Sequence, residues 1–263
     1  MIVILWISLS LLVIAAFLPK SYKSRFIFGG SGWIFLAIYW SSLIGGYLDL
    51  RDYVNVILVI TASVISLLIA HITFQAKDNN DKGRYEVFIS LSRAASIGGL
   101  IYFLFAEVEL LNTWIISTVT GQGIWLVEKV GFPVAQVAWN QLAVNGLDVE
   151  IILACTAIES IALFSGIISS ATGATTLRKV QAFMISVPVI YMLNIIHVSF
   201  TASAYGFAWF GTPEESFHIS EHIITKAGSL LALFIISYII LKILPEVTDM
   251  IDGVVKMMRV EFR

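Results

Sequence analysis

The hydrophobic positions of the chain gather into seven long apolar runs that are separated by shorter polar segments. About 20 consecutive apolar residues cross a bilayer as a helix, so each run predicts a transmembrane span. The first run has no basic segment before it and is followed by further runs, so we interpret it as a retained helix rather than a signal peptide. The predicted spans lie at roughly 2–18, 26–48, 53–75, 86–106, 151–171, 180–206 and 219–244.

The connection at about 107–150 is too apolar for a solvated linker. Its first half predicts an amphipathic or partly re-entrant helix, in which Trp114 and Trp125 suit the headgroup region. Its second half alternates apolar and polar residues around Asn145-Gly146, a pair typical of two-residue hairpin turns. The predicted fold is therefore an all-α polytopic membrane protein of about seven transmembrane helices, with a small extracytoplasmic helix and a β-hairpin that leads into the fifth span.

Four regions follow from this pattern. They are an N-terminal four-helix membrane region at 1–106, an extracytoplasmic or re-entrant segment at 107–150, a three-helix membrane region at 151–246 and a tail at 247–263. Basic residues gather in alternate connections and in the tail, and such residues favour the cytoplasmic side. We therefore expect the N-terminus outside and the C-terminus inside. The basic residues concerned are Lys20, Lys23, Arg25, Lys77, Lys82, Arg84, Arg178, Lys179, Lys256, Arg259 and Arg263.

Composition excludes several classes of protein. Hydrophobic residues make up 58% of the chain and charged residues 13%, whereas soluble domains carry about 25% charged residues. A net charge of −2 argues against nucleic-acid binding, which needs a concentrated basic patch. The single cysteine excludes an intramolecular disulfide and a cysteine-rich metal cage. We predict no cofactor and no metal.

Three chemically capable side chains are expected at one depth in the outer leaflet. Cys155 lies about one helical turn inside the fifth span, and His197 lies about 25 Å from the cytoplasmic start of the sixth. His222 falls in the first turn of the last span. A thiol beside imidazoles is the arrangement that nucleophilic catalysis requires, because a nearby base or cation raises the thiolate fraction.

Helical spacing adds three supporting residues to this candidate site. Asn194 lies three residues before His197, Glu159 four residues after Cys155, and Lys226 four residues after His222. Each of these groups also has a purely structural interpretation. The thiol is a small packing residue, histidines near helix ends anchor helices at the interface, and Glu159 and Asn194 are able to hydrogen-bond between helices.

Three other functions compete with catalysis by Cys155. The polar groups would line a pathway in a transporter or channel, although no inverted repeat is visible in the sequence. A membrane scaffold would bind other helices without activity. A metal-dependent protease would use His218 and His222, which share a helix face, but the HEXXH order is absent.

Three segments in order resemble the exosortase/archaeosortase family, and their last two are most similar to its archaeosortase branch. The segment LDVEIILACTAIESIALFSG resembles the region in which a short strand leads to the helix with the nucleophilic cysteine. The segment VPVIYMLNIIHVSF resembles the helix with a Pro-x5-Asn-x2-Arg pattern, and FHISEHIITKAGSLLALFIISYIILKILPE resembles the last helix with its His or Arg. The resemblance covers roughly 145–246 by the positions of these segments.

The resemblance implies a membrane-embedded cysteine transpeptidase, with 151–246 as its catalytic region. Such enzymes cut secreted proteins, typically S-layer glycoproteins, at a C-terminal tripartite signal of the PGF-CTERM type and pass the new C-terminus to a membrane lipid. Cys155 would form the thioester, His197 would donate the proton, and His222 would stabilise the transition state. His197 departs from the family, which has Arg there, and this leaves activity in question. Lys226 is an alternative to His222 as the second basic residue.

Overall fold

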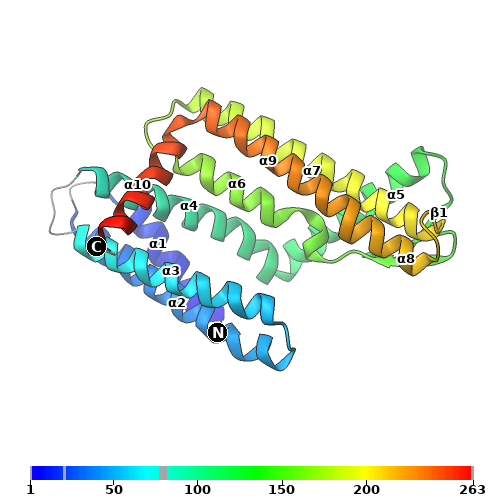
Figure 1. Cartoon of the computed structure of the whole chain (residues 1–263), viewed down its shortest axis with the longest axis horizontal. Helices are drawn as coiled ribbons and strands as arrows, with labels where there is room; N and C mark the ends of the chain where they lie inside the picture. The colour runs from blue at the N-terminus through cyan, green and yellow to red at the C-terminus, as the bar shows by residue number, and fades with distance from the viewer. Residues whose placement is uncertain (1, 20–21, 77–81, 262–263) are drawn as a thin grey trace. The chain divides into compact units, whose positions relative to one another are not determined.

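A computed structural model describes residues 2–19, 22–76 and 82–261 of the chain (Figure 1). The protein is helical apart from a small three-stranded sheet, and it forms two compact units. Unit 1 comprises Met1–Leu100, Gly166–Ala174 and Pro245–Arg263. Unit 2 comprises Ile101–Ser165 and Thr175–Leu244.

Unit 1 contains the N-terminal helices. Helix α2 packs against both α1 and α3. The buried Arg25 guanidinium donates a hydrogen bond of 3.0 Å to the carbonyl of Ala15, near the end of α1. Cations at a helix C-terminus stabilise its last carbonyls. The elements of this unit are α1 (Ile2–Phe17), α2 (Ser24–Asp49), α3 (Tyr53–Ala76), most of α4 (Lys82–Glu107), the end of α6 (Ile158–Ser170) and α10 (Pro245–Glu261).

Unit 2 is built around the long helix α7 (Thr176–Gly206), which packs against α5 (Glu109–Lys129) and α9 (Lys226–Ile243). Figure 1 shows α7 and α9 running side by side. Helix α9 continues the short α8 (Pro213–Phe217) and the π-helix η2 (His218–Thr225), so that 213–243 form one helical run. The apolar core of the unit joins α5, α7 and the sheet, and includes Ile115, Val119, Leu142, Val198 and Ala202.

The sheet has the order β1-β2-β3, with antiparallel pairs throughout. Its strands are β1 (Val134–Ala138), β2 (Gln141–Val144) and β3 (Leu147–Glu150). The predicted hairpin is present as β2 and β3, and Asn145 and Gly146 form its turn with φ of 53° and 80°. Glycine adopts such angles without strain, and asparagine adopts them more readily than most residues. Strand β1 was not predicted.

The fold class is confirmed, but seven spans are not. Five helices of the described chain are long and apolar enough to cross a membrane. The first and fifth predicted spans correspond to the apolar helices α1 and α6, which have only 16 and 13 residues. Membrane orientation stays a prediction; of the basic residues behind it, Lys20, Lys77 and Arg263 lie outside the described residues.

Candidate functional site

Cys155 lies in a short 3₁₀ turn and not inside an α-helix. After β3 the chain forms the short 3₁₀ helix η1 (Leu153–Thr156), and α6 begins only at Ile158. Ala157 between them is in the left-handed region with φ of 57°. Non-glycine residues rarely adopt this conformation, which costs about 1–2 kcal/mol and recurs at functional sites. The sequence missed this break because 151–157 is almost wholly apolar.

The break at Ala157 overturns one of the spacing arguments. Cys155 and Glu159 do not share a helix face, because the chain between them is not α-helical. The Glu159 side chain is exposed. The shared helix face that placed Glu159 beside the thiol is therefore absent, and its supporting role stays a prediction.

Asn194 ties the cysteine turn to helix α7. Its Nδ2 donates a hydrogen bond of 2.7 Å to the backbone carbonyl of Cys155. A second bond within the turn runs from Thr156 Oγ1 to the carbonyl of Leu153 at 2.6 Å. Asn194 therefore holds the backbone of the cysteine turn to α7.

His197 lies three residues further along the same helix and pairs with a carboxylate. Its Nε2 is 2.8 Å from Oε2 of Glu221, which also accepts a hydrogen bond of 3.3 Å from Thr201 Oγ1. The His197 and Glu221 side chains are 26% and 29% exposed, so the pair is sheltered but still reachable. His197 lies nine residues before the end of α7 and Glu221 eight after the start of α8. Both are thus about 12–14 Å from the turn that joins the two helices.

The thiol of Cys155 is half-buried and packs against the core of unit 2. Burial raises the pKa of this thiol above its ordinary value, a backbone hydrogen bond at Ile152 opposes the change, and the negative charge of Glu221 adds to it. Glu221 therefore acts on the thiol through its charge and on His197 through its hydrogen bond. A buried thiol with a raised pKa needs a base nearby to react at neutral pH.

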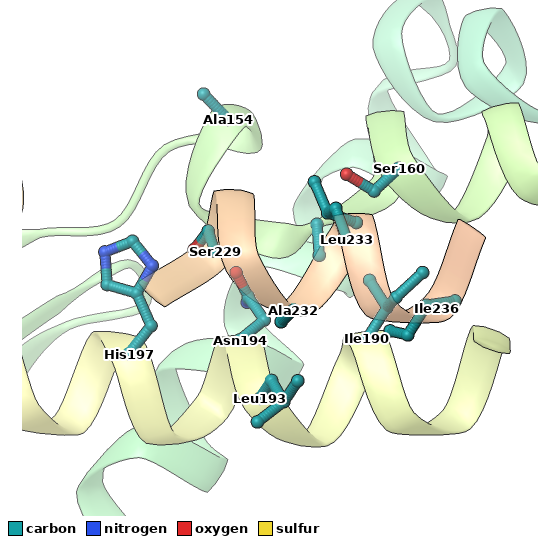
Figure 2. Close-up of a pocket in the computed structure, with 11 residues that line it drawn as sticks. Ala154, Ser160, Ile190, Leu193, Asn194, His197, Ser229, Ala232, Leu233 and Ile236 are labelled. Carbon is teal, nitrogen blue, oxygen red and sulfur yellow. The ribbon is translucent and has the colours of Figure 1, made fainter. Parts of the chain in front are cut away.

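A pocket of about 180 Å³ opens next to this group of residues (Figure 2). His197 and Asn194 extend into it from α7, Ser229 faces them from α9, and the remainder of the α7 and α9 lining is apolar. Ala154 and Ala157, on either side of the cysteine turn, also contribute to its wall. The lining consists of Ala154, Ala157, Ser160, Ile190, Leu193, Asn194, His197, Ser229, Ala232, Leu233 and Ile236. A bound chain would therefore meet polar groups at the His197 end and apolar groups further along.

The other two basic candidates, His222 and Lys226, have exposed side chains. The His222 side chain is exposed, and its ring centroid lies 5.2 Å from that of His218 and 6.3 Å from that of Phe217. Its link to the site is an electrostatic contact with Glu221. Lys226 is exposed on the first turn of α9. Among the described residues, no group of three His, Cys, Asp or Glu side chains has the geometry of a metal site.

Glu221 is the site residue that the sequence did not assign to the thiol. It lies within an apolar helical run, where a charged side chain is a signal in itself. Glu221 and His222 are neighbours, and the sequence favoured the imidazole. The π-helix η2 contains both residues, and π-turns are frequent at functional sites because they re-aim side chains.

Comparison with known proteins adds a family to this geometry. The family model described as transmembrane exosortase matches residues 1–239. The chain is 28% identical over 261 residues to archaeosortase A of Haloferax volcanii, covering 86% of this chain and 83% of that protein. It is 22% identical over 280 residues to archaeosortase A of Natronomonas pharaonis, covering 95% and 85%. No solved structure matches the chain.

Proposed function

The chain belongs to the transmembrane exosortase family, and we propose that it is a membrane-embedded cysteine transpeptidase in which Cys155 and His197 carry the chemistry. The family agrees with the resemblance found in the three sequence segments. The proposal rests above all on the hydrogen bond from Asn194 to the carbonyl of Cys155, because it joins the cysteine turn to the helix of His197. His197, Asn194 and the alanines on either side of Cys155 also line one pocket.

The first half of the proposed reaction forms a thioester. His197 takes the proton of the Cys155 thiol, and the sulfur attacks the carbonyl carbon of the scissile peptide bond. The tetrahedral intermediate collapses by breaking the carbon–nitrogen bond, and His197 returns the proton to the leaving amine. The new C-terminus stays on the sulfur as an acyl group, while the C-terminal fragment departs.

The second half of the reaction transfers this acyl group to a membrane lipid. A hydroxyl group of the lipid gives its proton to His197, attacks the thioester carbon and displaces the sulfur, which recovers the proton as a thiol. Water would give hydrolysis by the same steps. A site at the outer leaflet, with apolar surroundings, favours the lipid over water because it lowers the local water concentration.

The proposed substrates are secreted proteins, S-layer proteins among them, with a C-terminal tripartite signal of the PGF-CTERM type. The pocket supports this class of substrate, because its polar end at His197 suits a peptide group and its apolar part suits adjoining apolar side chains. The apolar helix of the signal would lie in the bilayer beside α7 and α9, whose outer residues include the exposed Leu193, Leu230 and Phe234.

His222 is retained as the proposed stabiliser of the oxyanion, with Lys226 as the alternative. A donor of this kind contributes about 3–4 kcal/mol to the transition state, so its loss lowers the rate by about 10² to 10³. His222→Ala and Lys226→Ala separate the two assignments. The variant with the larger loss of cleavage, at unchanged substrate binding, identifies the stabilising residue.

The proposal is tested with the protein in lipid vesicles and a reporter protein that ends in a short motif, an apolar helix and a basic cluster. We expect a truncated, lipid-bearing reporter by intact-mass analysis, and an acyl adduct on Cys155 when the lipid acceptor is limiting. Cys155→Ala abolishes both products. Cleavage by Cys155→Ala at the rate of the unaltered protein would show that the thiol is not the nucleophile.

A further inference from the structure

Glu221 carries a charge in the largely apolar helical run 213–243, and the proposed reaction has not given it a role. Its Oε2 is 2.8 Å from Nε2 of His197 and accepts a second hydrogen bond from Thr201 at 3.3 Å. Burying a carboxylate in a membrane helix costs free energy, so such carboxylates are usually paired with another polar group and are usually functional. Two partners on α7 for one carboxylate oxygen fix its position.

The hydrogen bond to Glu221 decides which nitrogen of His197 is free. An ionised carboxylate only accepts hydrogen bonds, so Nε2 must carry the proton in this contact. In neutral imidazole the other nitrogen, Nδ1, then has no proton and acts as an acceptor. A ring held in this tautomer is able to accept a proton at Nδ1 while remaining bonded to Glu221 at Nε2.

We propose that Glu221 is a positioning residue that holds His197 in this tautomer and stabilises the imidazolium formed when the thiol gives up its proton. The inference rests on the proposed function, since it assumes Cys155 as nucleophile and His197 as its base. Cys155, His197 and Glu221 then act as a nucleophile, a base and an orienting carboxylate. The same logic operates in the serine protease triad, where the orienting acid fixes the tautomer and is not itself protonated.

Glu221 has two opposed effects on the thiolate. Its charge repels the thiolate directly, and it stabilises the imidazolium that accompanies the thiolate. The second effect is larger near neutral pH, because Glu221 is hydrogen-bonded to His197 and electrostatic energy falls with distance. In alkaline solution the thiol ionises without a base, so only the repulsion remains.

Other ionisable groups near the His197–Glu221 pair also affect the stability of the thiolate. The elements packed against α7 are α5, β2, β3, η1, α8, η2 and α9. Among their described residues, the groups in electrostatic contact with Glu221 besides His197 are Cys155 on η1 and His222 on η2. His222 is positive only when protonated, so its contribution also fades as the pH rises. His222→Ala therefore accompanies the variants below.

The test uses the fact that Cys155 is the chain's only cysteine. Alkylation by iodoacetamide, followed by intact mass, therefore reports this thiol without any substrate. For Glu221→Gln we expect alkylation about tenfold slower near pH 7, which is less than the roughly 10²- to 10⁴-fold effect of a general base because His197 itself remains. Above the pH at which the thiol ionises unaided, we expect the same variant to react faster than the unaltered protein. The two pH profiles thus cross.

Several variants make the crossing specific to His197. In the His197→Ala background, Glu221→Gln speeds alkylation at every pH, because only the repulsion is left. His222→Ala leaves the crossing in place. Glu221→Asp keeps a carboxylate and recovers part of the neutral-pH rate. Glu214→Gln removes an exposed charge from the same helical run and leaves the profile unchanged.

Two outcomes would overturn the inference. Slower alkylation at all pH values, together with a lower unfolding temperature, would assign Glu221 a structural role. Faster alkylation at all pH values would make it a repelling charge and no more. Failure of the proposed function has a different signature, namely cleavage of the reporter by Cys155→Ala, and the alkylation profiles do not depend on that result.

Discussion

Replacing Asn194 tests the link between the cysteine turn and helix α7. The bond from Asn194 Nδ2 to the Cys155 carbonyl is 2.7 Å long and partly buried. Asn194→Ala removes the hydrogen-bond donor and leaves the Cys155 carbonyl without this partner, which costs about 1–3 kcal/mol of interaction free energy. If the bond positions the thiol in the transition state, this energy corresponds to a rate loss of about 5- to 150-fold. Asn194→Asp loses more, because a carboxylate oxygen faces the carbonyl and repels it.

The assay follows truncation of the reporter protein in vesicles, and thermal unfolding is measured in parallel. Tyr191→Phe is the matched control, because it removes a hydrogen bond of the same 2.7 Å length from the same helix. That bond runs from Tyr191 Oη to Gln122 Oε1 on α5, and not to the cysteine turn. We expect the control to lose about 1 kcal/mol of stability while cleaving at nearly the rate of the unaltered protein.

The comparison between the two variants decides the matter. If Asn194→Ala and Tyr191→Phe lose cleavage in equal measure, and in proportion to their loss of stability, Asn194 does not position the thiol. An Asn194→Ala variant that cleaves at full rate would refute the argument more directly. It would show that the turn keeps its geometry without the bond from α7.

Two further predictions concern the surroundings of the site. Arg178→Gln breaks the hydrogen bonds of 2.8 and 2.6 Å from the guanidinium to the Ile243 carbonyl, which join the start of α7 to the end of α9. We expect the free energy of unfolding to fall by about 1.5–3 kcal/mol, which is measured as a lower unfolding temperature. An unchanged unfolding temperature would show that these bonds are not needed for stability. Because burial raises the pKa of the Cys155 thiol, the main rise in its alkylation by iodoacetamide should occur at higher pH than for a free cysteine; a midpoint below about 8.5 would contradict this.

The hydrophobic pattern predicts much of the fold. The prediction fails in one segment, and the cause is local. The pattern located the helices of the last two spans, and Asn145-Gly146 located the turn between β2 and β3. It failed at 151–157, where an apolar segment forms a 3₁₀ turn and a left-handed residue in place of the first turns of a helix. Hydropathy measures how readily a side chain transfers to an apolar medium. It does not distinguish between the backbone conformations that an apolar segment is able to adopt. Hydrogen bonds to Asn140 and Asn194 fix this segment, and they come from distant parts of the chain.

Sequence spacing predicts which site residues share a helix face where the helices are regular α-helices. It fails where the helical period changes. Asn194 and His197 lie on the regular helix α7, so their shared face followed from their spacing. Glu221 and His222 lie in a π-helix. Adjacent residues of an α-helix point about 100° apart, and a π-turn inserts one extra residue, which rotates the following residues by a comparable angle. Spacing alone therefore could not decide which of the two faces α7. The hydrogen bond between Glu221 and His197 decides it, and it makes the carboxylate, rather than the second imidazole, the direct partner of the base.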